Sequence, residues 1–349
     1  MRVLVVGGTG FIGPHVVKAL VGGGHEVAVL HRGNHPDVLP AGVHGIECAD
    51  TSRAGRAGLL AALPQIRAFA PDVVVDMILM LERDAEIVID AFAGHARRLV
   101  LVSSMDVYRA FGQVLGVESG PPGSLPITED SPLRERLYPY RGESPRAADD
   151  PQHWRDDYDK IPVERVAFSR PELEAAVVRL PRVYGPGDAQ RRLFSYVRPM
   201  ADRRPLLLMD RALARWRWTR AYVENVAHAI ALAATHERAA GRTYNVAEAE
   251  TTSEATWVTS IGRVLGWSGR VVEAEAAALP EHLRFDGDAS HDISVDGSRI
   301  RRELGYVEPV GWEDGIRRTA EWELANPLRA DDALRAEYAA EDAAAALLR

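Results

Sequence analysis

Residues 2–13 read RVLVVGGTGFIG, a short apolar run that leads into three spaced glycines. The run predicts a buried β-strand, and the apolar-periodic residues after it predict a helix. Glycines at these spacings permit a tight turn, close approach of a pyrophosphate, and tight packing of the helix on the strand. The start of the helix would offer free N–H groups and a positive dipole end to that pyrophosphate. We therefore expect a dinucleotide site with contacts from Gly7, Thr9, Gly10, Phe11, Ile12 and Gly13.

The end of the second apolar run, residues 26–30, bears on which dinucleotide is bound. An acidic residue there would hold the ribose 2′-hydroxyl, whereas an arginine accommodates a 2′-phosphate. The chain has Arg32 there and no carboxylate before Asp37, which favours NADP (NADPH) over NAD. The alternative is that Arg32 is simply a surface arginine. Asp50, after the third run, is a candidate partner for the adenine amino group, or an ordinary surface or capping residue.

Short apolar runs alternate with helix-like stretches along the first half of the chain. This order predicts βαβ units and an α/β fold of the Rossmann type, with a doubly wound parallel sheet. The expected strands are 2–6, 26–30, 44–48, 72–76, 98–103 and 175–180, and the expected helices are 11–23, 54–69, 83–95 and 159–170.

The periodic pattern stops between residues 109 and 157, where Pro, Gly and charged residues dominate. So long a connection is unusual, and predicts either a functional cover over a site or a disordered insertion. We expect residues 1–180 to form the dinucleotide-binding domain, which can also recruit parts of 215–247. A smaller, partly interleaved substrate domain would take 181–329, and 330–349 would be a helical tail. Helices are expected there near 189–201, 223–236, 254–265, 297–304 and 312–325.

Composition excludes several classes of protein. The formal net charge of −8 argues against neutralising nucleic-acid phosphates or an anionic membrane surface. The single cysteine, Cys48, allows no intramolecular disulfide or thiolate cluster, and no Cys/His spacing indicates a metal site. No apolar run approaches the roughly 18 residues of a membrane span. We therefore expect a cytoplasmic protein without metal, nucleic acid or membrane as a partner.

Lysine is rare in this chain. Lys18 and Lys160 are the two lysines, which leaves 40 of the 42 basic residues as arginine. Lys160 lies in the segment DDYDKIPVE, residues 156–164. Arginine cannot easily replace a compact ammonium, because its planar fork differs in reach and charge density. A lysine retained here therefore indicates a specific role.

Several motifs together resemble the extended short-chain dehydrogenase/reductase superfamily. They are GGTGFIG at 7–13, SSMDVY at 103–108, Lys160, PRVYGPG at 181–187, RAYVENVAHAI at 220–230 and DGSRIRRELGY at 296–306. The resemblance covers about residues 1–325, and the combination is far more specific than any one motif.

The resemblance implies roles for Ser104 and Lys160. Ser104 would hydrogen-bond the substrate oxygen at which hydride chemistry occurs. Lys160 would hold the nicotinamide ribose and lower the pKa of a tyrosine one helical turn earlier. That tyrosine position carries Asp156 in this chain, which is typical of an atypical branch of the superfamily. Tyr158 would face away on a helix, but could reach the site if the helix begins only near Asp159.

The proton donor therefore stays open at this point. Tyr158 is one candidate and Asp156 a weaker one. Tyr138, Tyr140 and Tyr184 are other phenols that folding could bring close, and water or the substrate could also supply the proton.

Asp106 lies two residues after Ser104, the spacing at which the family's sugar dehydratases carry an acidic residue that removes a proton beside a transient ketone. It is therefore a candidate base, with a capping or surface role as the alternative. Met105 stands where several of those enzymes carry a second acid. Pro181 and Val183 are expected to line the nicotinamide, with a purely structural turn as the alternative.

Three further residues are candidates for substrate contact. Arg217 could bind a pyrophosphate through bidentate contacts, as an arginine does in family members that bind nucleotide sugars. Trp218, with Trp216, could instead form a flat wall for an aromatic or polycyclic substrate, or one Trp could simply pack in the core. Tyr184 is the third candidate.

The hypothesis that these residues favour is an NADP-dependent reductase acting on a carbonyl of a small molecule. A sugar-nucleotide epimerase or dehydratase, which would recycle its cofactor internally, is the first alternative. A non-catalytic dinucleotide-binding protein is the second. The resemblance also implies a homodimer paired through helices of the fourth and fifth βα units.

Overall fold

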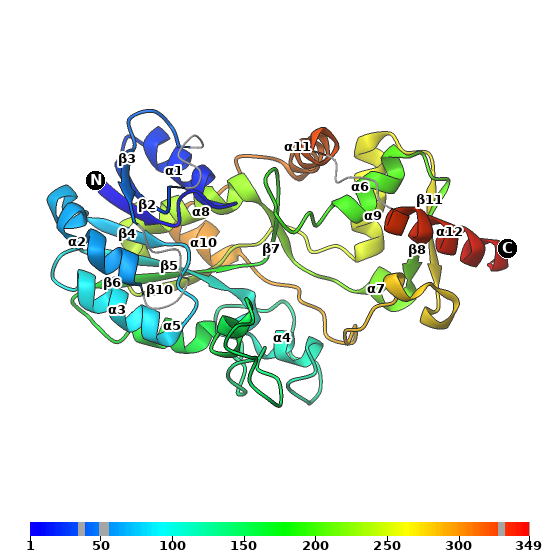
Figure 1. The fold of residues 1–349 in the computed structure, drawn as a ribbon, viewed down its shortest axis with the longest axis horizontal. Coiled ribbons are helices and arrows are strands. Elements are labelled where there is room, and N and C mark those ends of the chain that lie inside the picture. Colours follow the sequence, from blue (N-terminus) through cyan, green and yellow to red (C-terminus); the bar gives the residue numbers. More distant parts are fainter. Residues whose placement is uncertain (34–38, 49–55, 327–331, 349) are drawn as a thin grey trace.

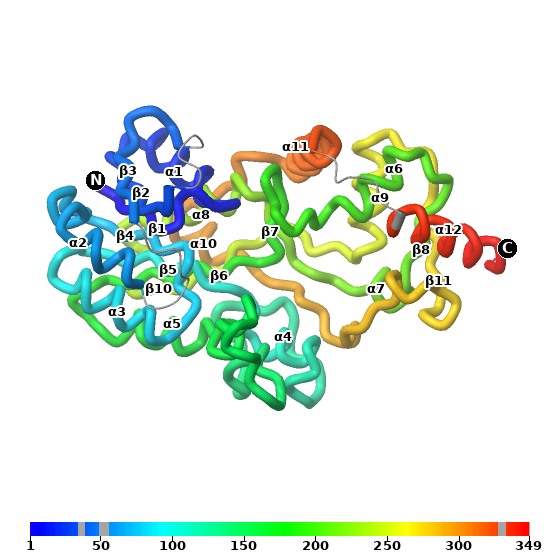
Figure 2. Tube along the Cα trace, in the orientation of Figure 1, coloured from blue at the N-terminus to red at the C-terminus, as the bar shows by residue number. Residues whose placement is uncertain are grey.

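The computed structural model describes residues 1–33, 39–48, 56–326 and 332–348. Figures 1 and 2 show two bodies side by side, with a strand-and-helix body at the N-terminal end and a smaller body at the C-terminal end. The central sheet has seven strands in the order β10-β6-β5-β4-β1-β2-β3. The strands are β1 (Arg2–Val6), β2 (Glu26–His31), β3 (His44–Glu47), β4 (Val73–Asp76), β5 (Arg98–Ser104), β6 (Glu174–Leu180) and β10 (Arg242–Asn245).

Every neighbouring pair in this sheet is parallel. In β1, for example, Val3 lies opposite both Val27 of β2 and Val73 of β4. The prediction of an α/β fold of the Rossmann type is therefore confirmed.

The sheet is buried on both faces, which explains why its strands read as continuous apolar runs. Along β1, Val3 and Val5 belong to one core cluster and Leu4 and Val6 to the other, because successive side chains point to opposite faces. Helices α1 (Gly13–Gly22) and α8 (Val223–Thr235) cover the first face. The second face is covered by α2 (Ala57–Phe69), α3 (Glu82–Phe92) and α5 (Lys160–Ala167).

The smaller body contains residues from several separate parts of the chain. Its elements are α6 (Phe194–Ala201), β8 (Leu206–Asp210), α7 (Arg211–Arg215), α9 (Glu254–Leu265), β11 (Arg270–Ala274), α11 (Trp312–Ala325) and α12 (Asp332–Leu347). The short strands β7 (Arg182–Tyr184) and β9 (Arg220–Tyr222) pair in parallel between the two bodies. The chain then returns to the sheet through α8 and β10, and α10 (Ser298–Leu304) packs against both.

Five strands of this half were not predicted: β7, β8, β9, β10 and β11. They have three to five residues each, and β10 reads RTYN, without the apolar alternation that indicates a strand. Their pairing is decided by partners far away in the sequence, as β10 with β6 shows. The five helices expected in this half all form, within a few residues of their expected bounds.

Residues 109–157 pack against both bodies. They contain α4 (Arg109–Val114) and the 3₁₀ turn η3 (His153–Asp156), while η2 (Met105–Val107) precedes them. Isolated bridges join Tyr108 to Leu133 and Ile127 to Val295. Glu129 accepts a hydrogen bond from the backbone N–H of Asn245 at 2.9 Å. These contacts favour the interpretation of the segment as an ordered cover.

The other 3₁₀ turns are η4 (Glu237–Ala239), η5 (Ala276–Ala278) and η6 (Glu281–Leu283). Within the described ranges, no helix is long and apolar enough to cross a membrane.

The entry to α1 generates a prediction about folding. A Cβ added at Gly13 would lie 2.5 Å from the carbonyl carbon of Gly8, whereas one at Gly10 would meet nothing closer than 3.9 Å. Gly13→Ala should therefore lower the free energy of unfolding by about 1–3 kcal/mol, as overpacking does. Urea unfolding of both variants checks this. Gly10→Ala is the matched control, and equal stability of the two variants would contradict the argument.

Candidate active site

The glycine turn between β1 and α1 has the features that a dinucleotide requires. Gly7 has φ +86°, a left-handed conformation that glycine adopts without strain. Gly10 leaves open space where other residues carry a side chain. Among the described residues, no side chain caps α1, and its first turn carries no acidic residue. The N-terminus of α1 therefore keeps its positive end for an anionic group, and the turn fits a pyrophosphate.

Of the two residues expected to select the dinucleotide, Arg32 and Asp50, the structure describes only Arg32. Arg32 follows β2 directly and is exposed, and its contact with a 2′-phosphate stays a prediction. Asp50 lies outside the described residues. The loop after β7 approaches the glycine turn, since a Cβ at Gly187 would lie 3.8 Å from the Phe11 ring. Pro181, half-buried, and Val183, buried, lie at the start of this connection.

Lys160 is the first residue of α5 and is only 5% exposed. Its Nζ donates hydrogen bonds to the backbone carbonyls of Val102, at 2.9 Å, and Leu79. The ammonium is thus held where β4 and β5 end, the edge of the sheet at which ligands bind in such folds. Burial lowers the pKa of Lys160 to about 8, against the opposing effect of nearby carboxylates.

Ser104, Asp106 and Tyr158 are joined by hydrogen bonds at the end of β5. The Asp106 backbone N–H donates to Ser104 Oγ at 3.2 Å, and the Tyr158 hydroxyl donates to Asp106 Oδ2 at 2.8 Å. Asp106 is only 4% exposed. The structure therefore brings three of the predicted catalytic residues into contact, and their catalytic roles remain predictions.

Tyr158 reaches this position because it precedes the helix. The turn η3 ends at Asp156, and Asp159 has extended backbone before α5 begins at Lys160. Asp156, at the position where the family has its tyrosine, points elsewhere. Its carboxylate accepts from the backbone N–H of Arg146 at 2.6 Å and is paired with the Arg146 guanidinium. Asp156 therefore anchors the 109–157 segment and is already engaged as an ion pair.

Aromatic residues of the 109–157 segment surround Tyr158. The rings of Tyr140 and Trp154 lie 5.5 Å and 6.0 Å from the Tyr158 ring, between centroids. Burial raises the pKa of Tyr158 well above its ordinary value, and the Asp106 carboxylate adds to the rise. Burial likewise raises the pKa of Asp106, opposed by Tyr158, Arg134 and Lys160. Burial thus disfavours the charged form of both groups.

Sequence reasoning missed the ion pair that holds these residues together. The side chains of Arg134 and Asp159 are both fully buried, and Arg134 Nη2 lies 2.9 Å from Asp159 Oδ1. Arg134 Nε also donates to the Asp106 carbonyl at 2.5 Å. Asp159 in turn accepts from the backbone N–H groups of Ile161 and Tyr138, so it caps α5 and holds the 109–157 segment. Nothing in the local sequence distinguishes Arg134 from the many other arginines.

An apolar wall lies next to the Ser104–Asp106–Tyr158 group. Met105 belongs to a core cluster against which Trp218 and Phe111 pack, and these two rings meet edge-on at 6.1 Å. The guanidinium of Arg182 lies 5.2 Å from the Trp218 ring centroid. Trp218 thus forms part of a wall beside the site. Trp216 is buried, and its Nε1–H donates a hydrogen bond to the His291 carbonyl at 2.8 Å.

Two predicted substrate contacts are used within the protein. Arg217 is exposed, and its guanidinium donates to the Thr251 carbonyl at 3.0 Å. Tyr184 is 1% exposed, and its hydroxyl donates to Glu248 at 2.8 Å. Trp218 is therefore the predicted substrate contact that lies next to the candidate site, because it packs against the core cluster that contains Met105.

Comparison with known proteins places this geometry in a family. The sequence model of the NAD dependent epimerase/dehydratase family matches residues 3–247, which is most of the chain. The chain belongs to this family, which confirms the resemblance to the extended short-chain dehydrogenase/reductase superfamily. The expected class, an NAD(P)-dependent enzyme of the extended type, is confirmed at the level of the family.

Individual relatives differ in their reactions. The chain is 30% identical over 251 residues to a 2′-dehydrokanamycin reductase of Streptomyces kanamyceticus, covering 69% of this chain and 60% of that protein. It is 27% identical over 343 residues to a dTDP-glucose 4,6-dehydratase of Streptomyces griseus, covering 92% and 93%. The chain therefore spans less than two thirds of the reductase's length.

Solved structures agree on the fold. WbmG of Bordetella bronchiseptica, in complex with NAD and UDP, superposes with a TM-score of 0.66 at 19% identity, covering 93% of this chain and 96% of that one. At this identity the likeness shows the fold alone.

The buried ion pair generates a prediction about stability. Arg134→Met would leave the Asp159 carboxylate buried without its partner, a loss that typically costs about 3–5 kcal/mol. Arg141→Met is the matched control, because the Arg141–Asp157 pair is about half exposed on both sides and such pairs contribute less than about 1 kcal/mol. Urea unfolding of both variants measures the difference. Similar losses in the two variants would show that Arg134 is no more important than a surface arginine.

Proposed function

We propose that the protein is an NADPH-dependent reductase of a ketone on a small molecule, such as a sugar derivative or other secondary metabolite. The observation that carries the proposal is the hydrogen-bonded group Ser104, Asp106 and Tyr158 beside the buried Lys160 ammonium. The similarity to a 2′-dehydrokanamycin reductase supports it. A small-molecule substrate and a second copy of the chain are the partners included in the proposal.

The cofactor would be held by the glycine turn and the N-terminus of α1, with Arg32 beside its 2′-phosphate and Lys160 at its nicotinamide ribose. When bound, the reduced nicotinamide supplies the hydride. The Ser104 hydroxyl is placed to donate a hydrogen bond to the carbonyl oxygen of the substrate, where negative charge develops. The Lys160 ammonium adds positive charge at the same edge of the sheet.

The proton for that oxygen would come from Tyr158. Its phenol keeps its proton at neutral pH, and Asp106 directly behind it is held towards its neutral form by burial. When Tyr158 gives its proton to the substrate oxygen, an Asp106 that carries a proton would transfer that proton to the phenolate oxygen, which leaves Asp106 as the carboxylate. Tyr158 would thus act as the proton donor, and Asp106 would restore its proton. This arrangement does not need the spacing of one helical turn that separates the tyrosine from the lysine in the family.

A dehydratase is the second candidate, because Asp106 lies beside Ser104 and the dehydratase of Streptomyces griseus matches most of the chain. Elimination of water needs an acid for the leaving hydroxyl as well as a base. Met105 is a buried thioether and cannot protonate a leaving group. Asp106 is tied to Tyr158. The reductase is therefore favoured over the dehydratase.

Consumption of NADPH tests the proposal. The full-length protein is incubated with NADPH or NADH and a panel of keto sugars, keto amino sugars and quinones, and loss of the reduced cofactor is compared with product formed. We expect one NADPH consumed for each alcohol formed, with kcat/KM at least about tenfold higher for NADPH than for NADH. Turnover of dTDP-glucose without net consumption would instead establish the dehydratase.

Tyr158→Phe serves as the active-site variant in the same assay and should lower kcat by about 10²–10⁴-fold, the usual contribution of a positioned acid. Tyr138→Phe is its control, since the Tyr138 ring contacts Arg141 and this contact survives the change. Equal rates for Tyr158→Phe and the unchanged protein would remove Tyr158 as the donor.

The pKa of Lys160 predicts a pH dependence. Its ammonium loses its proton as the pH rises through about 8, and with it the charge that the cofactor needs. We expect kcat/KM for NADPH to fall above this pH, since that ratio reports ionisations of the free enzyme. Lys160→Met lacks this charge at every pH, so its kcat/KM for NADPH should be at least about 100-fold lower. It also lacks the ionising group, so its kcat/KM should not fall as the pH rises through about 8. A fall that persists in Lys160→Met would assign the ionisation to another group.

A further inference from the structure

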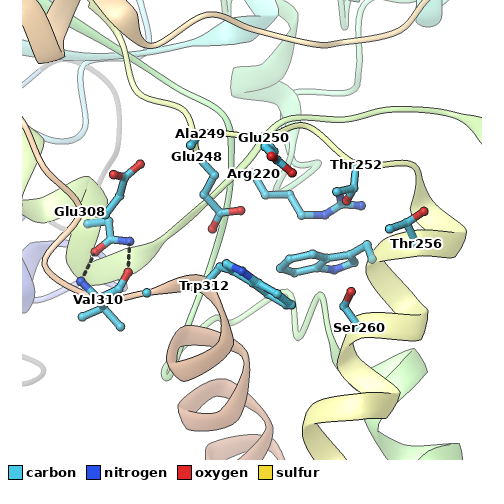
Figure 3. Close-up of a pocket in the computed structure, with 13 residues that line it drawn as sticks. Arg220, Glu248, Ala249, Glu250, Thr252, Thr256, Ser260, Glu308, Val310 and Trp312 are labelled. Carbon is cyan, nitrogen blue, oxygen red and sulfur yellow. Dashed lines mark hydrogen bonds between the residues drawn. The ribbon is translucent and has the colours of Figure 1, made fainter.

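A cavity of about 640 Å³ lies between the start of α8, the loop after β10, and helices α9 and α11. Figure 3 shows Glu248 and Arg220 on one side of it, with Trp312 and Ser260 on the other. None of Ser104, Asp106, Tyr158 and Lys160 lines the cavity. Its volume is within the range of small-molecule sites, about 300–1,000 Å³.

Two indole rings form much of its wall. Trp257 comes from α9 and Trp312 from the first residue of α11. Trp312 is 38% exposed, so part of its ring is accessible to a ligand. Each ring already has a guanidinium near its centroid, Arg220 at 4.8 Å from Trp257 and Arg263 at 5.4 Å from Trp312. Both rings therefore attract cations in this structure.

The charge on the wall is negative. Three carboxylates line the cavity, from Glu248, Glu250 and Glu308, and Glu308 is paired with Arg301. Glu248 accepts the Tyr184 hydroxyl, and Glu250 has no ion pair among the described residues. Two carboxylates are thus without an ion-pair partner in the part of the chain that the structure describes.

Arg220, the basic residue of the lining, is already committed. It is 5% exposed, its Nη2 is paired with Glu254, and its Nη1 donates to the Trp218 carbonyl at 2.9 Å. It therefore offers little to an anionic ligand. On another side of the cavity, the Asn225 side-chain amide makes two hydrogen bonds, of 2.8 and 3.0 Å, with the backbone of Val310 (Figure 3).

We propose that this cavity binds a small organic cation, an amine carried on a ring or a short apolar body, between the two indoles and the carboxylates of Glu248 and Glu250. The indole faces would cover the body of the ligand and attract its charge, and the carboxylates would accept its N–H groups. The inference is independent of the proposed reductase function, because no reacting residue takes part.

Isothermal titration calorimetry with a matched pair of probes tests the proposal. Benzylamine is a cation at pH 8, and benzyl alcohol is its neutral isostere; at this pH Glu248 is charged, since burial raises its pKa only to about 7. We expect the full-length protein to bind benzylamine with a Kd at least about tenfold lower than that for benzyl alcohol. Equal affinity for the two, or no heat from benzylamine up to about 10 mM, would overturn the proposal.

Variants locate the binding. Trp312→Ala and Glu250→Gln change exposed side chains and should each weaken benzylamine binding by about fivefold or more. Leu324→Ala, exposed on the same helix, and Glu82→Gln, exposed on α3, are the controls and should leave it unchanged. Thermal unfolding confirms that each variant is folded. Benzylamine binding that is unaffected by Trp312→Ala and Glu250→Gln would place the ligand elsewhere and overturn the proposal. Because the readout is binding, a failure here leaves the reductase proposal unaffected.

Discussion

The buried ion pair between Arg134 and Asp159 is the interaction on which the candidate active site depends. Both side chains are excluded from water, so each charge needs the other. Asp159 caps α5 and therefore sets where Lys160 begins the helix and where Tyr158 precedes it. Arg134 also holds the carbonyl of Asp106. One pair thus joins the end of β5, the start of α5 and the 109–157 segment.

This arrangement explains how the site can lack the tyrosine of the family. On a regular helix, residues two apart point in nearly opposite directions, so Tyr158 could not share a face with Lys160. Because α5 begins at Lys160, the extended residue before it turns Tyr158 towards Asp106 instead. Asp156, at the position of the missing tyrosine, is paired with Arg146 and holds the cover. The cover therefore holds the Ser104–Asp106–Tyr158 group in place, and it contributes Phe111 to the adjoining apolar wall.

The sequence predicted the sheet and its helices well, because these depend on local apolar periodicity and on glycines with a steric role. Gly13 shows this, since backbone atoms fill the space where its Cβ would lie. It also predicted that Tyr158 could reach the site if the helix began only near Asp159, and α5 begins at Lys160. It did not predict the short strands, the role of Arg134, or the burial of Tyr184 against Glu248. Each of these depends on partners distant in the chain.

By itself, then, the sequence determined the Rossmann sheet, the glycine turn and the retention of Ser104 and Lys160, since local propensity and spacing are written in neighbouring residues. The tertiary structure alone decided which arginines are buried and which phenol donates to the Asp106 carboxylate. It also decided that two indoles and the carboxylates of Glu248 and Glu250, which have no ion-pair partner among the described residues, face one cavity. The physical reason is that burial and pairing of charge are properties of the folded surroundings. An arginine in solvent and an arginine in the core have the same letter in the sequence, and only its neighbours in space distinguish them.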